Sequence, residues 1–258
     1  MGCEWQCLST GTLVGMGLMV TLCGIGVGPG DPELITLKGW RRLQQARVIA
    51  FPAGLGGRRG IAEEVIAGYK EPWQTCLPLE FPYVLEQAVL EQAWQKAAEQ
   101  VYAYLVQGTD VVFVSEGDVS FYSTFSYLAA AVQALAPHVQ IEAIPGVCSP
   151  LAAAASLGVP LTLGSDRLAI LPAMYHVEEL AQVWAWAEVM VLMKVRSVYG
   201  QAWQWLQEHR LLEQAAVVSW ATTPKQQIYT PLTDFPTLTL PYFSLLMVWK
   251  RKLHLRNV

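Results

Sequence analysis

Short, mostly apolar segments rich in β-branched residues alternate with helix-like segments along most of this chain. The strand-like segments cover residues 19–27, 48–52, 110–115, 139–144, 168–171, 189–193, 215–220 and 242–249. Segments with helical spacing of apolar residues lie between them, beginning at residue 31 and covering 59–67, 83–106, 150–157 and 201–208. Such alternation is typical of a parallel sheet covered by helices. The sequence therefore predicts an α/β fold.

Pro145 and Gly146 end the strand-like segment at 139–144, near the middle of the chain. A length of 258 residues accommodates two modest domains, each with its own core. We therefore expect an N-terminal extension over residues 1–18, an N-terminal α/β domain over 19–145 and a C-terminal α/β domain over 146–258. A cleft is expected between the two domains.

The 26 residues from Trp5 to Gly30 carry no charge, a length that could span a bilayer. The run holds seven glycines, however, and each costs roughly 1 kcal/mol against alanine inside a helix. No Lys or Arg flanks it and no basic segment precedes it, which argues against a membrane span and a secretory signal. We expect a buried strand from Met19, a candidate natural start, and no membrane association. A membrane-attached binding protein anchored by residues 5–30 is the alternative, which cell fractionation would distinguish.

Charge and cysteine content narrow the class of function. Lys and Arg total 17 against 21 Asp and Glu, so the chain lacks the overall basic charge that a general nucleic-acid binder needs. Five scattered cysteines form no disulfide framework and indicate reduced thiols in the cytoplasm. Cys3 and Cys7 have the first spacing of a radical iron–sulfur site, but Thr10 stands where the third cysteine ligand would be. The four histidines lie far apart in the sequence. We therefore expect no bound metal.

A glycine-rich loop, Gly26-Val-Gly-Pro-Gly-Asp31, follows the first strand-like segment. In a dinucleotide-binding Gly-x-Gly-x-x-Gly motif the last position would fall on Pro29 or Asp31, and residues 48–51 supply no acid for a ribose. The Gly-Lys-Ser/Thr of a phosphate-binding loop is also missing. The next residues instead predict the start of a helix. Asp31 can accept from free backbone amides, Pro32 has the φ of a first helical residue, and Glu33 suits the positive end of the helix.

Five segments of the chain carry a family resemblance when they are taken together and in order. They are Gly26–Thr36, Ser115–Phe125, Ile144–Ser149, Leu192–Lys194 and Ala221–Gln226. This set resembles the tetrapyrrole (precorrin) methyltransferases that use S-adenosylmethionine. Phe121–Phe125 and Pro241–Ser244 resemble most the branch that methylates C20 of precorrin-2 in cobalamin synthesis. The resemblance covers residues 19–250, essentially the whole chain.

The resemblance implies two α/β domains, S-adenosylmethionine in the cleft between them, and a homodimer. Glycines would let main-chain amides approach the ligand, carboxylates would bond its amino group or hydroxyls, and small or apolar residues would pack on its adenine. Val119 stands where the family usually has Pro, which leaves the backbone of that loop less restricted. The implied cofactor-binding residues are Gly28, Pro29, Gly30, Asp31, Glu116, Gly117, Asp118, Ser123, Thr124, Ser149, Met193, Ala221 and Thr222.

The implied reaction transfers a methyl group from a sulfonium to an electron-rich carbon. The main task of such an enzyme is to hold the two groups in line, about 3 Å apart, in a dry cleft. A proton must then leave the methylated carbon. Asp118, Glu116 and Asp31 are the candidate bases, and the macrocycle or water is the alternative acceptor.

The implied substrate is rich in carboxylates, although the chain is net acidic. Arg58 and Arg59, after the glycines of residues 54–57, are the first candidates for binding them, and Lys194 and Arg196 come next. A solvated loop is the alternative for the two arginines. Tyr122 is a further candidate substrate contact, or it packs beneath its own loop.

The motifs leave two questions of substrate open. The metal-free and cobalt-containing forms of precorrin-2 share the same motifs, so we expect one of the two. The alternative function is methylation of another acceptor by the same fold: a different corrin position, uroporphyrinogen III, RNA or protein.

Overall fold

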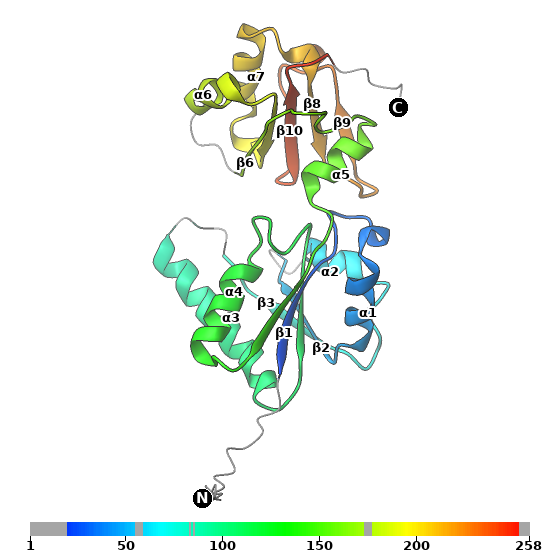
Figure 1. Cartoon of the computed structure of the whole chain (residues 1–258), viewed down its shortest axis with the longest axis vertical. Coiled ribbons are helices and arrows are strands. Elements are labelled where there is room, and N and C mark those ends of the chain that lie inside the picture. The colour runs from blue at the N-terminus through cyan, green and yellow to red at the C-terminus, as the bar shows by residue number, and fades with distance from the viewer. Residues whose placement is uncertain (1–19, 55–58, 83, 85, 173–176, 253–258) are drawn as a thin grey trace, which may run out of the picture.

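The computed structural model describes residues 20–54, 59–82, 84, 86–172 and 177–252. These residues form two five-stranded sheets, the first from strands up to residue 144 and the second from strands after residue 167 (Figure 1). Helices cover both sheets, which confirms the predicted α/β fold with two domains. The division after residue 145 stays a prediction, and the expected N-terminal extension lies outside the described residues.

The N-terminal sheet is entirely parallel, with strand order β3-β2-β4-β1-β5. Its strands are β1 (Thr21–Gly26), β2 (Val48–Pro52), β3 (Thr75–Leu79), β4 (Val111–Ser115) and β5 (Gln140–Ile144). The helices that follow the strands are α1 (Leu37–Gln45), α2 (Ile61–Ile66), α3 (Gln87–Leu105) and α4 (Phe125–Leu135). The central strands are buried on both faces, as expected for near-continuous runs of apolar residues in a parallel sheet.

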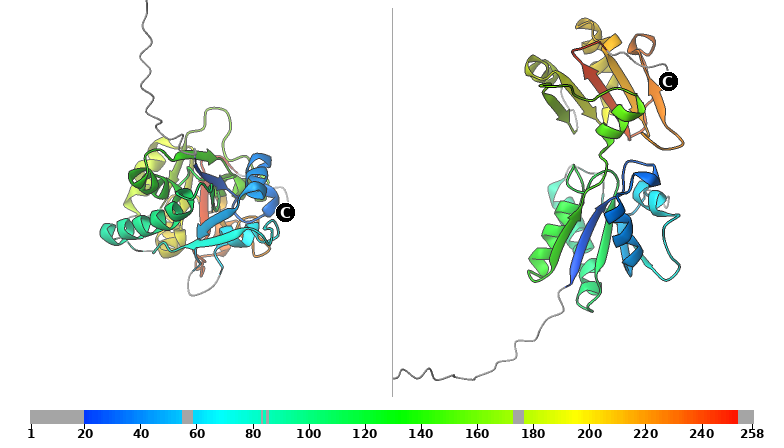
Figure 2. Two further views of the ribbon diagram at one scale, coloured as in Figure 1. Left: turned by 90° about the horizontal axis from the view of Figure 1, so that it is seen from below. Right: turned by 45° about the vertical axis from the view of Figure 1, so that its right-hand side comes forward.

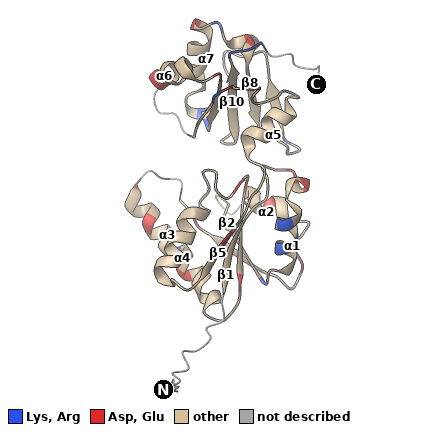
Figure 3. Ribbon diagram, viewed as in Figure 1, with Lys and Arg blue, Asp and Glu red and all other residues tan. Residues whose placement is uncertain are grey.

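Neighbouring residues of one strand serve opposite cores, because successive side chains point to opposite faces of a sheet. Leu22 packs with Val101 of α3 and Leu128 of α4. Cys23, the next residue, packs on the other face with Leu43 of α1 and with residues of α2. Figure 2 shows these helices on the two sides of the sheet, and Figure 3 shows that charged residues are concentrated outside the central strands.

A topological switch point lies between β1 and β4, which are hydrogen-bonded neighbours. The chain leaves β1 for α1 on one face of the sheet, and it leaves β4 for α4 on the opposite face. The connections from these two strands therefore lead to helices on opposite faces of the sheet. Ligands of open α/β sheets bind in the crevice at such a switch point.

The C-terminal sheet is mixed, with strand order β6-β7-β10-β8-β9. Its strands are β6 (Leu168–Leu171), β7 (Val189–Met193), β8 (Ala215–Ser219), β9 (Gln227–Tyr229) and β10 (Ser244–Trp249). β6 and β7 are parallel, whereas β10 runs antiparallel to β7 and β8. One face packs against α5 (Ser149–Ser156), and the other packs against α6 (Glu178–Trp186) and α7 (Tyr199–Glu208).

The strands predicted at 48–52, 168–171 and 189–193 match β2, β6 and β7. The helix predicted from residue 31 is wrong at its start. Asp31 does accept a hydrogen bond from the backbone N–H of Glu33, but only a 3-10 turn, Pro32–Leu34, follows. Ile35 and Thr36 then adopt extended backbone, and α1 begins at Leu37, with the Thr36 hydroxyl accepting from the Gly39 N–H. β3 and α4 were not among the predicted elements.

The loops after β1, β4 and β5 meet backbone to backbone. A Cβ atom on Gly26 would lie 2.6 Å from the nitrogen of Gly146 and 2.7 Å from the carbonyl oxygen of Gly117. Gly146 is equally crowded by the backbone of Gly26 and Gly117. Side chains at these two positions would therefore push the three loops apart. Val119, at the position where the family usually has Pro, is buried in the core against α3 and α4.

Asp118 joins two of these loops with its carboxylate. One oxygen accepts from the backbone N–H of Ser120 at 2.8 Å and from its hydroxyl at 2.5 Å. The other oxygen accepts from the backbone N–H of Gly146 at 2.8 Å. Both oxygens of this nearly buried group are thus engaged in holding the loop after β4 to the loop after β5.

Among the described residues, no helix has the length and apolar character needed to cross a membrane. The same residues contain no cluster of three or more His, Cys, Asp or Glu side chains that could hold a metal ion.

We expect Asp118→Asn to lower the free energy of unfolding by about 1.5–3 kcal/mol, the usual contribution of hydrogen bonds to a charged group. The substituted amide also presents a donor where the carboxylate accepts from an N–H. Urea unfolding at about pH 7 measures the change. Asp234→Asn, at an exposed carboxylate, is the control and should change stability little.

The same carboxylate makes stability depend on pH. Burial acts to raise the pKa of Asp118, but hydrogen bonds from the Ser120 side chain and from the Gly146 and Ser120 backbone hold the pKa below its ordinary value. A lowered pKa stabilises the fold above the unfolded pKa of about 4, and the effect is lost as pH falls through the folded pKa. The stability difference between wild type and Asp118→Asn should shrink below about pH 4. A constant difference down to acid pH would contradict this role.

Candidate functional site

A cavity of about 740 Å³ lies between the carboxyl edge of the N-terminal sheet and the ends of β7, β8 and β10. This volume is within the usual range for small-molecule sites. Both domains line it. The lining residues that were candidates from the sequence are Pro29, Glu116, Gly117, Asp118, Tyr122, Ser123, Thr124, Ser149, Met193, Lys194, Arg196 and Ala221.

The first glycine loop pairs with the loop after β4. The backbone N–H of Gly28 donates to the carbonyl of Gly117 at 3.2 Å, and the N–H of Gly117 donates to the carbonyl of Gly28 at 2.8 Å. Both residues have positive φ, +80° and +70°, which favours glycine at each position. The pairing places Pro29, the next residue, at the wall of the cavity.

Gly30 and Asp31 then dock on the C-terminal domain. The backbone N–H of Asp31 donates to the hydroxyl of Thr222 at 3.1 Å. A Cβ atom on Gly30 would clash with the methyl group of Thr223. Gly28, Gly30, Asp31 and Thr222, all predicted to bind cofactor, are not among the residues that line the cavity. Their contacts instead join the first loop to the second domain and to the loop after β4.

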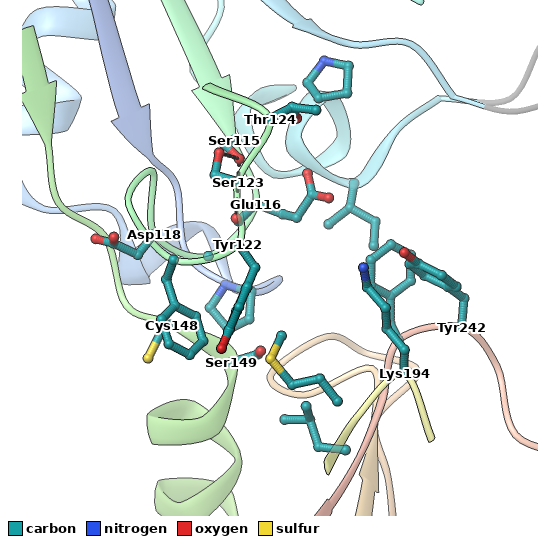
Figure 4. A pocket seen from close by; sticks show the side chains of 18 of the residues that line it. Ser115, Glu116, Asp118, Tyr122, Ser123, Thr124, Cys148, Ser149, Lys194 and Tyr242 are labelled. Atoms are coloured by element: carbon teal, nitrogen blue, oxygen red, sulfur yellow. Dashed lines mark hydrogen bonds between the residues drawn. The ribbon is translucent and has the colours of Figure 1, made fainter. Parts of the chain in front are cut away.

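Glu116 is the first residue after β4, and its side chain points into the cavity (Figure 4). Burial raises its pKa, and this outweighs the lowering by its own backbone N–H and by the Lys194 ammonium. A carboxyl group with a raised pKa is a stronger base once it is ionised. Figure 4 shows the Lys194 side chain approaching from the opposite wall.

The other two candidate bases are placed differently. The Asp118 carboxylate points away from Glu116 and Lys194 (Figure 4), and both of its oxygens are held by Ser120 and Gly146. Asp31 caps the turn at Glu33 and is not among the lining residues. Of the three candidates, Glu116 is the carboxylate that faces the cavity without being committed to another loop.

Two serines hold the loop that follows β4 against α4. The hydroxyls of Ser115 and Ser123 lie 2.9 Å apart, and the Ser123 hydroxyl accepts from the backbone N–H of Phe125 at 3.1 Å. Tyr122 precedes Ser123 with φ of +53° and an exposed ring. The loop therefore presents Tyr122, Ser123 and Thr124 to the cavity in a fixed arrangement.

The C-terminal wall is largely apolar. Met193 ends β7, Ala221 follows β8 by two residues, and Leu245 lies in β10. Such a surface can pack against a flat aromatic base. The cavity is also lined on this wall by Tyr242, Phe243 and Ser244. No site role was expected for them or for Leu245, although Pro241–Ser244 was part of the resemblance.

Lining residues that follow other strands were also missed. Pro52 ends β2 and Ala53 follows it, Phe81 follows β3 by two residues, and Cys148 precedes α5. The rule that ligands bind beyond the carboxyl ends of parallel strands could have found the first of these. Phe81 needed β3, an element that the sequence analysis did not predict.

Backbone strain is concentrated around the cavity. Five described residues other than glycine have positive φ, and two of them, Tyr122 and Lys194, line the cavity. Two more, Trp220 and Thr222, flank the lining residue Ala221. Such conformations persist where the surrounding structure imposes them, and they cluster at functional sites.

Only one of the two arginines predicted first to bind substrate lies among the described residues. Arg58 lies outside the described residues. Arg59 is exposed, lies 3.7 Å from Glu63 as an ion pair one helical turn away, and is not among the lining residues. Lys194 and Arg196, the second choice, both line the cavity.

The chain is similar in sequence to a known protein family and to several of its members. The model of the family described as tetrapyrrole (corrin/porphyrin) methylases matches residues 21–236. A precorrin-2 C(20)-methyltransferase from Sinorhizobium sp is 34% identical over 247 residues, which cover 92% of this chain and 98% of the relative. A cobalt-precorrin-2 C(20)-methyltransferase from Salmonella typhimurium is 30% identical over 231 residues, which cover 89% and 96%.

The chain spans 46%, about half, of the length of the mycobacterial relatives named cobalamin biosynthesis protein CobIJ, with 34% identity over 239 residues. In fold, it resembles a uroporphyrin-III C-methyl transferase from Thermus thermophilus complexed with S-adenyl homocysteine, with a TM-score of 0.64 and 21% identity. That likeness covers 89% of this chain and 97% of the other. The match to the family model and the full-length relatives establish that this chain belongs to the tetrapyrrole methylase family.

Proposed function

We propose that the chain transfers a methyl group from S-adenosylmethionine to C20 of precorrin-2 or of its cobalt complex, in cobalamin biosynthesis. One observation carries the proposal. All five segments of the family resemblance, which are far apart in the sequence, contribute a residue to the same cavity: Pro29, Glu116, Ser149, Met193 and Ala221. The names of the full-length relatives supply the acceptor carbon.

The residues present fit S-adenosylmethionine chemically. Met193, Ala221 and Leu245 would pack on its adenine, and the loop between Glu116 and Thr124 would offer backbone groups and hydroxyls to its polar parts. The positive φ of Gly117 lets this backbone come close to a ligand. When bound, the donor supplies an electrophilic methyl group on sulfur.

The chain's own residues would then position the acceptor and remove its proton. The apolar walls exclude water and hold the acceptor carbon in line with the methyl group, at about 3 Å. Methylation forms a carbon–carbon bond at C20 while the bond from sulfur to the methyl group breaks. The proton at C20 then passes to the Glu116 carboxylate, whose raised pKa suits it to this role.

We also propose a homodimer in the cytoplasm, no bound metal, and domains that divide after residue 145. The support is the family resemblance and, for the division, the change of sheet between β5 and β6. Light scattering of the purified full chain would measure its mass in solution.

The activity is expected to appear as incorporation of one methyl group at C20 of precorrin-2 or of its cobalt-containing form, cobalt-factor II. Both acceptors should be assayed side by side with labelled S-adenosylmethionine, and the methylated position should be assigned by NMR. Methylation at another corrin position, or none with either acceptor, would contradict the proposal. Uroporphyrinogen III is the matched control acceptor.

Glu116→Gln should lower the rate of turnover by about 100-fold or more, the usual contribution of a general base. Because only the ionised carboxylate accepts a proton, wild-type turnover should rise with pH through the raised pKa of Glu116, and the variant should lose this rise. Binding of S-adenosylhomocysteine should change little. Glu33→Gln, at an exposed carboxylate in the 3-10 turn Pro32–Leu34, is the control. An unchanged rate and pH profile would assign the proton to water or the macrocycle.

A further inference from the structure

The described walls of the cavity carry four charged side chains: Glu116, Asp118, Lys194 and Arg196. Both carboxylate oxygens of Asp118 are already hydrogen-bonded within the loops. Lys194 and Arg196 form no ion pair with any described carboxylate, although the Lys194 ammonium acts electrostatically on Glu116. Two cations without an ion-pair partner at a cavity wall are positioned to receive an anionic ligand.

Lys194 is held toward the cavity by its backbone and by an aromatic ring. It follows β7 directly, with φ of +54°, a conformation that few residues other than glycine adopt. Its Nζ lies 5.5 Å from the centroid of the Tyr242 ring, a cation–π distance. Figure 4 shows Lys194 and Tyr242 together on the wall opposite Glu116. The ammonium is thus oriented without being paired.

Arg196 stands on a short turn that is anchored in the C-terminal core. The turn is the 3-10 helix Val195–Ser197, and the Val195 side chain is fully buried on the face of the sheet that packs against α7. Tyr199, the first residue of α7, donates its hydroxyl to the carbonyl of Phe235 at 2.6 Å. The turn therefore has little freedom to move Arg196 away from the cavity.

One part of the wall contributed by the N-terminal domain is apolar. It is lined by Ile61, Phe81, Pro82, Val84 and Phe121. A flat apolar ring with acidic groups on its rim would match this pair of walls. The ring would lie against the apolar side chains and the acidic rim would face the two cations.

We propose that Lys194 and Arg196 are the specificity-determining pair that binds rim carboxylates of the tetrapyrrole substrate, with the ring lying against Phe81 and Phe121. This inference rests on the proposed function. It assigns to the C-terminal wall the role that the sequence analysis first gave to Arg58 and Arg59. It also explains how a net acidic chain can accept an acidic substrate, because the local charge at this wall is positive.

Binding of uroporphyrin III, a fluorescent ring with a carboxylate rim, tests the pair. Lys194→Gln and Arg196→Gln should each weaken binding about 10-fold, and the double variant more, as expected for lost charge-assisted hydrogen bonds. Binding should also become less sensitive to salt. The methyl ester of the same porphyrin should bind wild type and variants alike. Equal binding of the free acid by wild type and the double variant would overturn the proposal.

Two controls separate lost charge from lost structure. Lys225→Gln removes a nearby cation that lies 5.7 Å from the Trp220 ring but does not line the cavity, so porphyrin binding should not change. Lys194→Arg should restore most of the affinity lost in Lys194→Gln. Unchanged affinity for S-adenosylhomocysteine would show that each variant keeps a folded cleft. Binding is the primary measurement because Lys194 also lowers the pKa of Glu116 and so affects turnover.

The test distinguishes failure of this inference from failure of the proposed function. If precorrin-2 is methylated and the double variant keeps the wild-type KM for it, the pair is wrong and the function stands. If wild type binds uroporphyrin III through the pair but methylates neither acceptor, the function is wrong and the pair stands.

Discussion

The cavity is built on a close contact between the backbones of three loops. The loops after β1, β4 and β5 meet at Gly26, Gly117 and Gly146, where there is no room for a side chain at Gly26 or Gly146. Asp118 adds a charged acceptor that ties the second loop to the third. Because these loops follow neighbouring strands of a parallel sheet, their contact fixes the floor of the cavity. The strands set the positions at which the loops begin, and the contacts between the loops set their further course.

The floor becomes a cavity through the contact of the first loop with the second domain. Gly30 approaches Thr223, and the Asp31 backbone donates to Thr222, so the same loop that pairs with Gly117 also touches the C-terminal domain. The strained backbone at Lys194, Trp220 and Thr222 belongs to the loops that complete this contact and the opposite wall. Both domains thus contribute to a site that neither could form alone.

The charge distribution of the walls fits the chemistry that we propose. A mostly apolar lining raises the pKa of Glu116 and keeps water from the reacting groups. The positive charges stand on the opposite wall, where Tyr242 and the buried Val195 restrain them. The Lys194 ammonium lowers the pKa of Glu116, but burial outweighs this effect and leaves the pKa raised.

Local residue type is enough to predict the α/β class, most strand positions and the glycine-rich loop, because strand burial and tight turns depend on it. The resemblance of five short segments also pointed to Glu116, Ser149 and Met193, which do line one cavity. The folded structure is needed to tell that Asp118 holds loops together while Glu116 faces the cavity, since two acids in one turn look alike in a sequence. It also placed Lys194 and Arg196 at the wall and Arg59 outside it. The physical reason is that direction and burial of a side chain depend on packing between segments far apart in the chain.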